Sequence, residues 1–301
     1  MNDQTTARAC GLFEKGLTPD AGAGECRKAV GPIPQSAGRY DSRAESHTDL
    51  GFRHLEQGNT EEALICFNRA IELQPGNPEA YNNAGYVYEK MDRFSGAMQM
   101  YQKALALDGK NVEAMINIAH VRDLEGDYFG ALQNYKAALA TEPDNVNALF
   151  CLGVLYDRYD MFDEAISQYQ RVIALNPAHR KAIFNLSNLH IQTGNHQKAV
   201  DLLKHLIEQD PDNAKAWNNI GSLYEQLGDI DEAVRCWQQC LKLHPFQIEA
   251  NINLARAQFL SGKAVGHDSG RREITNRLRF VLALDPPNDQ AKKLLAQIEA
   301  S

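Results

Sequence analysis

Three side chains near the C-terminal end of the chain have the types and spacing to bind a soft metal ion. Cys236, Cys240 and His244 follow one another at four-residue intervals, which places them on one face of a helix. Thiolate and imidazole groups are suitable ligands for zinc and copper. Cys240, however, occupies a place where earlier segments of similar pattern carry alanine, and Pro245 ends the helix directly after His244. Core packing explains these residues better, and we expect no metal site.

No other arrangement of residues indicates catalysis. The chain contains no P-loop, no dinucleotide-binding fingerprint and no nucleophile elbow. Its six cysteines include no CxxC pair, so reduced thiols are expected rather than a disulfide framework or a zinc finger. We expect no catalytic residues, no cofactor and a non-catalytic function.

The composition excludes two classes of partner. A net charge of −8 and a pI of about 5.6 argue against a nucleic-acid binder, which needs a basic surface to displace counterions. No apolar run approaches the length of a membrane span, and the N-terminus lacks the apolar segment of a secretory signal. We therefore expect no membrane insertion and a cytoplasmic location.

The strongest pattern in the chain is a repeat of 34 residues. Four series of positions follow this interval: a small residue, an alanine, a large or aromatic residue, and a proline. They are Gly51, Gly85, Ala119, Gly153, Ser187, Gly221 and Ala255; Ala63, Ala97, Ala131, Ala165, Ala199 and Ala233; Phe67, Tyr101, Tyr135, Tyr169, Leu203 and Trp237; and Pro75, Gly109, Pro143, Pro177, Pro211 and Pro245. Each unit therefore predicts the same local structure, and a stack of such units is needed to bury the apolar faces.

One unit, residues 214–247, predicts a helical hairpin. Its first half has apolar residues at three- and four-residue spacing and ends at Gly228, which can adopt the left-handed conformation that terminates a helix. Asp229 and Glu232 form a capping box for a second helix. Gly221 and Ala233 are small, so the two helices can approach closely. The fold class predicted is all-α, a right-handed solenoid of hairpins.

These motifs resemble the tetratricopeptide repeat (TPR) family over about four-fifths of the chain. The resemblance implies seven units, 44–77, 78–111, 112–145, 146–179, 180–213, 214–247 and a degenerate 248–286, followed by a capping helix at 287–301. Asp92 and Asp160 replace the turn glycine, which the left-handed tolerance of Asp allows. Residues 262–272 are expected to form a long, mobile connection. Residues 1–43, rich in Gly, Ala and Pro, are expected to be a mostly disordered tail.

The resemblance also implies a binding groove lined by the first helix of each unit. The sixth place of the units forms an asparagine column, Asn83, Asn117, Asn185, Asn219 and Asn253, and the fifth place carries Ile116, Phe150 and Phe184. An amide can both donate and accept, so the column could hold an extended peptide backbone, as in the repeats of O-linked N-acetylglucosamine transferases. Alternatively, it is only a structural feature of the family. The three apolar residues are expected to be an exposed stripe, although packing in the core is the alternative.

Charge changes sign along the expected groove. Acidic residues occupy groove places in the first four units and basic residues in the last three: Glu45, Glu79, Glu89, Glu113, Asp123 and Asp157, then Lys181, Lys215 and Arg256. A partner segment is therefore expected to carry basic residues over the N-terminal repeats. The fifth places of the first three units, Thr48, Asn82 and Ile116, lack the basic residues by which some family members clamp the carboxylate of heat-shock chaperones.

The function expected is a scaffold, adaptor or assembly factor that holds an extended or helical segment of one or more partner proteins. Two alternatives remain open on the sequence. The chain could self-assemble into a homo-oligomeric scaffold, or it could be an accessory subunit of a glycosyltransferase or a secretion complex.

Overall fold

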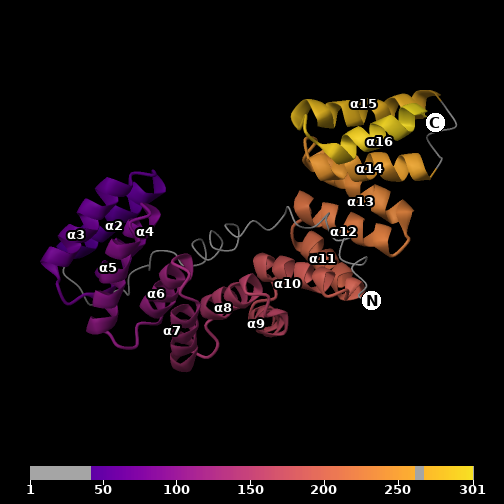
Figure 1. The fold of residues 1–301 in the computed structure, drawn as a ribbon. Coiled ribbons are helices and arrows are strands. Elements are labelled where there is room, and N and C mark those ends of the chain that lie inside the picture. Colours follow the sequence, from indigo (N-terminus) through magenta and orange to yellow (C-terminus); the bar gives the residue numbers. More distant parts are fainter. Residues whose placement is uncertain (1–41, 262–267, 301) are drawn as a thin grey trace. The chain divides into compact units, whose positions relative to one another are not determined.

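The computed structural model describes residues 42–261 and 268–300, and every regular element in them is a helix (Figure 1). The helices are α2 (Ser42–Glu56), α3 (Thr60–Leu73), α4 (Pro78–Lys90), α5 (Phe94–Leu107), α6 (Val112–Leu124), α7 (Tyr128–Thr141), α8 (Val146–Arg158), α9 (Phe162–Leu175), α10 (Arg180–Gln192), α11 (His196–Gln209), α12 (Ala214–Gln226), α13 (Ile230–Leu243), α14 (Ile248–Leu260), α15 (Asp268–Leu284) and α16 (Asp289–Ala300). The predicted all-α repeat solenoid is confirmed. The tail expected at 1–43 lies almost wholly outside the described residues.

The chain divides into two compact units between Pro177 and Ala178. Within the described residues, unit 1 holds the hairpins α2–α3, α4–α5, α6–α7 and α8–α9. Unit 2 holds α10–α11, α12–α13 and α14–α15, followed by α16. The 34-residue register runs through this division without a change, so the sequence pattern gave no sign of it. The first helix of each hairpin is called its inner helix below.

Side-chain caps start most of the inner helices. Asn77, Asn111, Asn145 and Asn213 each accept a hydrogen bond from a backbone N–H two or three residues further on. His179 does the same for α10 through Nδ1, 3.1 Å from the N–H of Ala182. A cap of this kind contributes about 1 kcal/mol to helix stability. The caps share the last place of the 34-residue unit, so they form a further regular series in the sequence.

The turns inside the hairpins have the conformation that the sequence predicts. Gly228 has φ of 84°, and Asp92 and Asp160 have φ of 55° and 56°, so both aspartates adopt the left-handed region in place of glycine. The side chain of Asp229 accepts a hydrogen bond from the N–H of Glu232 at 3.2 Å, which confirms that Asp229 caps α13.

Small residues in the inner helices let aromatic rings of the second helices approach the backbone. A Cβ atom added at Gly85 would lie 2.6 Å from the ring of Tyr101, and one at Gly221 would lie 2.7 Å from the indole nitrogen of Trp237. Both rings are fully buried. The expected reason for the small residue, close approach of the two helices, is confirmed at these positions.

The C-terminal end differs from the expectation in one respect. Helix α15 already begins at Asp268, so the last residues of the connection expected at 262–272 are helical. Helix α16 buries Ala291, Leu294 and Ile298 against α14 and α15 and leaves its other face in solvent.

Candidate functional site

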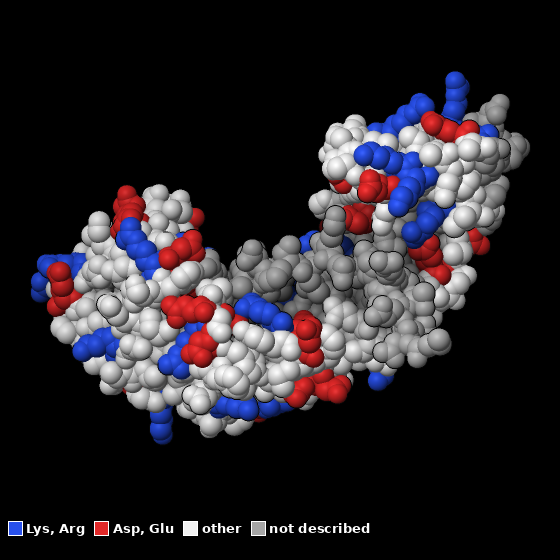
Figure 2. Space-filling model, viewed as in Figure 1, with Lys and Arg blue, Asp and Glu red and all other residues white. Residues whose placement is uncertain are grey.

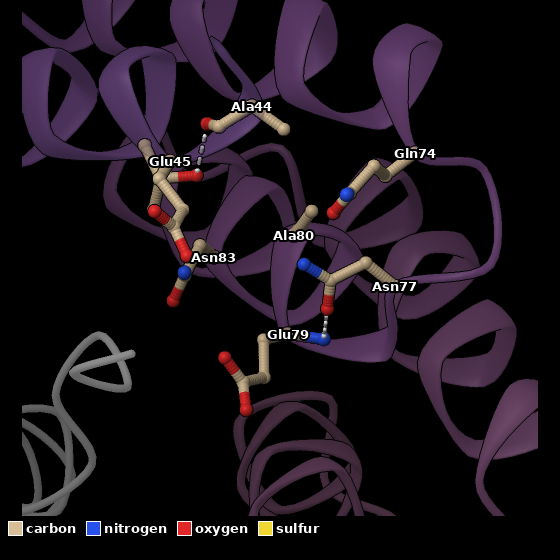
Figure 3. A pocket seen from close by; sticks show the side chains of 8 residues that line it. Ala44, Glu45, Gln74, Asn77, Glu79, Ala80 and Asn83 are labelled. Carbon is tan, nitrogen blue, oxygen red and sulfur yellow. Dashed lines mark hydrogen bonds between the residues drawn. The ribbon is translucent and has the colours of Figure 1, made fainter. Parts of the chain in front are cut away.

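A shallow pocket lies on unit 1 between the inner helices α2 and α4 (Figure 3). It is an open hollow and not a cavity, with enclosed room for about one water molecule. The lining residues are Ala44, Glu45, Thr48, Gln74, Asn77, Glu79, Ala80 and Asn83. Most of these side chains are polar, and the charged ones among them are the two glutamates, so the pocket suits a cationic group that also donates hydrogen bonds.

Two of the polar side chains in the pocket are used by the fold itself. The Thr48 hydroxyl donates to the carbonyl of Ala44 at 3.1 Å, and the Asn77 side chain accepts from the N–H of Glu79 at 3.0 Å. The side chains of Glu45, Glu79 and Asn83 border the same hollow in Figure 3. They add two carboxylates and an amide to the wall of the pocket.

The two pocket glutamates belong to a row that continues along unit 1. Glu45, Glu79 and Glu113 occupy the second place of the first three repeat units, and we call them the acidic row. Glu45 and Glu79 are half-buried and Glu113 is exposed. Acidic and basic side chains are otherwise interspersed over the face of unit 1 seen in Figure 2. In unit 2 the same place carries Lys181, which is half-buried, and Lys215 and Glu249, which are exposed.

The asparagine column connects neighbouring inner helices. Asn117 donates to the side-chain oxygen of Asn82 at 2.9 Å, and Asn219 donates to that of Asn188 at 3.2 Å. Asn253 donates to the Ser222 hydroxyl at 3.5 Å. These amides thus join one hairpin to the preceding one. Their role is structural, but the hydrogen bonds run between helices and not within a single helix. Asn83 is 1 % exposed and Asn185 is 7 % exposed; Asn83 also lines the pocket.

The apolar stripe is not exposed as expected. Ile116 and Phe150 are 2 % and 0 % exposed, and only Phe184 is half-buried. The ring of Phe150 lies 5.9 Å from that of Tyr169 in the second helix of the same hairpin. Packing within the repeat core explains why an apolar residue stands at position 150. An apolar residue at the fifth place of a unit does not by itself indicate an exposed binding surface.

Several acidic residues expected in the groove are buried in pairs instead. Glu89 lies 3.1 Å from Nδ1 of His120 and accepts a hydrogen bond from the hydroxyl of Tyr101 at 3.1 Å. Asp123 is 6 % exposed and lies 2.7 Å from a guanidinium nitrogen of Arg158. Burial raises the pKa of Asp123, while the charge of Arg158 acts in the opposite direction. These side chains join neighbouring hairpins of unit 1.

A spacing of 31 residues marks many of these contacts. It separates Asn219 from Asn188, Asn253 from Ser222, and Arg256 from Glu225, whose charged groups approach to 2.6 Å. At these contacts the inner helices are offset by about one helical turn from the 34-residue repeat, whereas Asn117–Asn82 and Arg158–Asp123 pair at 35 residues. His120 and Arg158 do not lie 34 residues from their acidic partners, Glu89 and Asp123. The 34-residue sequence pattern therefore did not predict these two pairs.

The contribution of the Asp157 side chain to the free energy of unfolding depends on pH. Burial, with a contribution from Asp160, raises its pKa to about 6. Because the folded chain holds this proton more tightly than the unfolded chain, the charged form opposes folding, and this contribution grows as the pH rises from about 4 to about 6. We expect Asp157→Asn to stabilise the chain at pH 8 by up to about 3 kcal/mol and to have little effect at pH 4. Urea unfolding at both pH values, followed by circular dichroism, measures this; an equal effect at both would contradict it.

The thiols of Cys236 and Cys240 are not reactive thiolates near neutral pH. Cys236 and Cys240 are buried, and burial raises their pKa values to about 12 and about 11. In the described part of the chain, no three His, Cys, Asp or Glu side chains are grouped so that they could hold a metal ion. None of the helices formed by residues 42–261 and 268–300 has the length and apolar character to cross a membrane.

Stacked helical hairpins of this kind, with small residues facing aromatic rings, define an all-α repeat protein. Three family models match the chain: the TPR domain of cytochrome c-type biogenesis protein H at residues 136–246, a TPR repeat at 51–92 and a tetratricopeptide repeat at 78–111. The chain is a tetratricopeptide repeat protein. No curated protein sequence is similar enough to count as a match.

Solved structures of similar fold support this assignment. PilF of Pseudomonas aeruginosa is 21 % identical with a TM-score of 0.61, and the match covers 70 % of this chain and 96 % of PilF. YrrB, described as a TPR protein with an unusual peptide-binding site, is 23 % identical with a TM-score of 0.51 and coverages of 61 % and 95 %. A chain of the APC/C hetero-tetramer Cut9–Hcn1 is 19 % identical with a TM-score of 0.59 and coverages of 97 % and 55 %. At these identities the likeness shows the fold alone, and the family matches support a protein-interaction module as the general role.

Proposed function

We propose that unit 1 binds a segment of a partner protein along its inner helices, and that the acidic row holds basic side chains of that segment. The pocket between α2 and α4 carries this proposal, because it brings Glu45 and Glu79 to one hollow beside the amide of Asn83. A lysine or arginine side chain would supply both the charge and the donors that these groups accept.

The asparagine column has a divided role in this proposal. Asn83 lines the pocket but is 1 % exposed, so we propose that it shapes the wall of the pocket while the two glutamates contact the segment. Asn117 supports the surface of unit 1 by linking α4 and α6, whereas Asn219 and Asn253 make similar links inside unit 2. Among proteins of similar fold, YrrB is described as having a peptide-binding site, which is an analogy at the level of the fold. The chain would act as a non-catalytic scaffold or adaptor.

Affinity capture from a native lysate tests the proposal. The wild-type chain is compared with Glu45→Gln/Glu79→Gln, and a matched control, Glu62→Gln/Glu208→Gln, removes the same charge from exposed places on the second helices α3 and α11. We expect a partner that is retained by the wild type and the control and is reduced at least about tenfold by the pocket variant. Equal retention by all three proteins would contradict the proposal, and recovery of the chain alone would favour self-assembly.

A further inference from the structure

The turns of the third and fourth hairpins carry a group of aromatic and sulfur side chains at one edge of unit 1. We call Tyr128, Phe129, Tyr159 and Met161 the aromatic edge. The ring centroids of Tyr128 and Phe129 are 5.3 Å apart, and those of Tyr128 and Tyr159 are 4.5 Å apart. The Tyr128 hydroxyl donates to the sulfur of Met161 at 3.0 Å, which joins the turn before α7 to the turn before α9. The four side chains therefore form one surface across two repeats.

Comparison among the repeats shows that the fold does not need an aromatic side chain at the position of Phe129. Phe129 is 76 % exposed, and Tyr159 is 40 % exposed. The place of Phe129 in the repeat is filled by polar residues in the other hairpins of this register: Glu61, Ser95, Asp163, Gln197 and Asp231. An apolar ring where the fold accepts serine or aspartate leaves solvent-exposed apolar surface without a packing reason, and such surface indicates contact with another molecule.

Carboxylates surround the aromatic edge. The same turns and the first turns of α7 and α9 contain Glu125, Asp127, Asp160, Asp163 and Glu164. Glu164 is close enough to Tyr128 that, after burial, its charge is the next cause of the raised pKa of that tyrosine. The two arginines of α6 and α8 are already engaged, since Arg122 lies 4.0 Å from Asp127 and Arg158 lies 2.7 Å from the buried Asp123. The exposed rings are thus bordered by an excess of negative charge.

We propose that the aromatic edge is a second interaction surface, which binds a segment of a partner protein in which arginine or lysine alternates with apolar side chains. A guanidinium or ammonium group is attracted to the face of an aromatic ring and pairs with a neighbouring carboxylate. The apolar side chains between them cover Phe129 and Tyr159. This surface lies at the hairpin turns and uses no residue of the acidic row, so it acts independently of the pocket between α2 and α4.

A fluorine probe at the surface tests the proposal directly. The full chain, with 4-fluorophenylalanine at position 129, is titrated at low salt with the peptide acetyl-GRLRLRG-amide and with acetyl-GELELEG-amide. We expect a saturable change of the fluorine resonance with the arginine peptide alone. The variants Phe129→Ser and Tyr159→Thr use residues that other repeats carry at these places, Ser95 and Thr193. Combined with Glu164→Gln, they should weaken binding of the arginine peptide at least about fivefold. Because Phe129→Ser removes the probe, calorimetric titration measures binding for this variant, and circular dichroism checks that its helix content is unchanged.

Two controls separate the aromatic edge from the pocket and from self-association of the chain. Glu45→Gln/Glu79→Gln should leave the fluorine response unchanged, because those residues belong to the pocket. The proposal would be overturned if the fluorine resonance no longer changed in the Glu45→Gln/Glu79→Gln variant. It would also be overturned if the resonance did not saturate with the arginine peptide, or changed equally with both peptides. It would also be overturned if sedimentation showed a dimer that Phe129→Ser dissociates, since a second copy of the chain would then occupy the edge.

Discussion

Replacing Arg158 by methionine is expected to lower the free energy of unfolding by about 3–5 kcal/mol at pH 8. The substitution removes the guanidinium that lies 2.7 Å from Asp123. Asp123 is 6 % exposed, and burial already raises its pKa while Arg158 opposes this rise. Without the arginine, a carboxylate must either stay charged in the interior or take up a proton, and both cost free energy at pH 8.

The dependence on pH distinguishes this mechanism from a loss of packing. Removal of Arg158 should raise the pKa of Asp123 further, so the carboxyl is protonated more readily at pH 5 and the loss of stability should be smaller there than at pH 8. The double variant Asp123→Leu/Arg158→Met should lose less stability than Arg158→Met alone, because no buried charge is left unpaired. Urea unfolding followed by circular dichroism measures all three proteins. Equal losses at both pH values and no rescue by the second substitution would contradict this mechanism.

The second large effect is expected from Trp237→Ala, which should lower the free energy of unfolding by about 3–5 kcal/mol. Trp237 is 0 % exposed, and its indole packs against the backbone at Gly221. Truncation leaves a cavity that the two helices of the hairpin can close only in part. Because α12 also carries Asn219, which bonds the preceding inner helix, loosening of this hairpin should reach its neighbour in unit 2.

The other tryptophan of the chain provides a control. Trp217 is half-buried at the margin of the core cluster that contains Trp237, and its indole donates to the carbonyl of Pro211 at 2.8 Å. We expect Trp217→Ala to cost less than half as much as Trp237→Ala, since it opens no internal cavity. Trp237→Phe should be intermediate, because Phe67 fills the same place against Gly51 in the first hairpin. Equal losses from the two alanine substitutions would show that contact with Gly221 is not what stabilises the hairpin.

The 34-residue register predicted the fold well because it reports contacts inside each hairpin. The pairs Gly85 with Tyr101 and Gly221 with Trp237 recur at a constant separation, so their residue types are visible in the sequence. The left-handed turns at Asp92 and Asp160 followed from the same alignment of units.

Contacts between hairpins were harder to predict, since they depend on how far one inner helix is displaced along the next. Asn117, Asn219 and Asp123 occupy places expected to face a ligand, yet each bonds a residue of a neighbouring inner helix. A search for polar pairs 31 residues apart would have indicated some of these partners, such as His120 for Glu89. Exposure of Ile116 and Phe150 could not be judged from residue type, because an apolar residue at the fifth place fits both a ligand face and the core.

The acidic row of unit 1 is the centre of the proposed function, and a dissociation constant tests it most directly. A peptide covering the segment captured by the wild-type chain is titrated into the wild type, Glu45→Gln/Glu79→Gln and the control Glu62→Gln/Glu208→Gln, at 50 and 500 mM salt. We expect the pocket variant to bind at least about tenfold more weakly at low salt, with a smaller difference at high salt and with the control equal to the wild type. Equal affinities of all three proteins at low salt would contradict the proposal that Glu45 and Glu79 hold basic side chains of the partner.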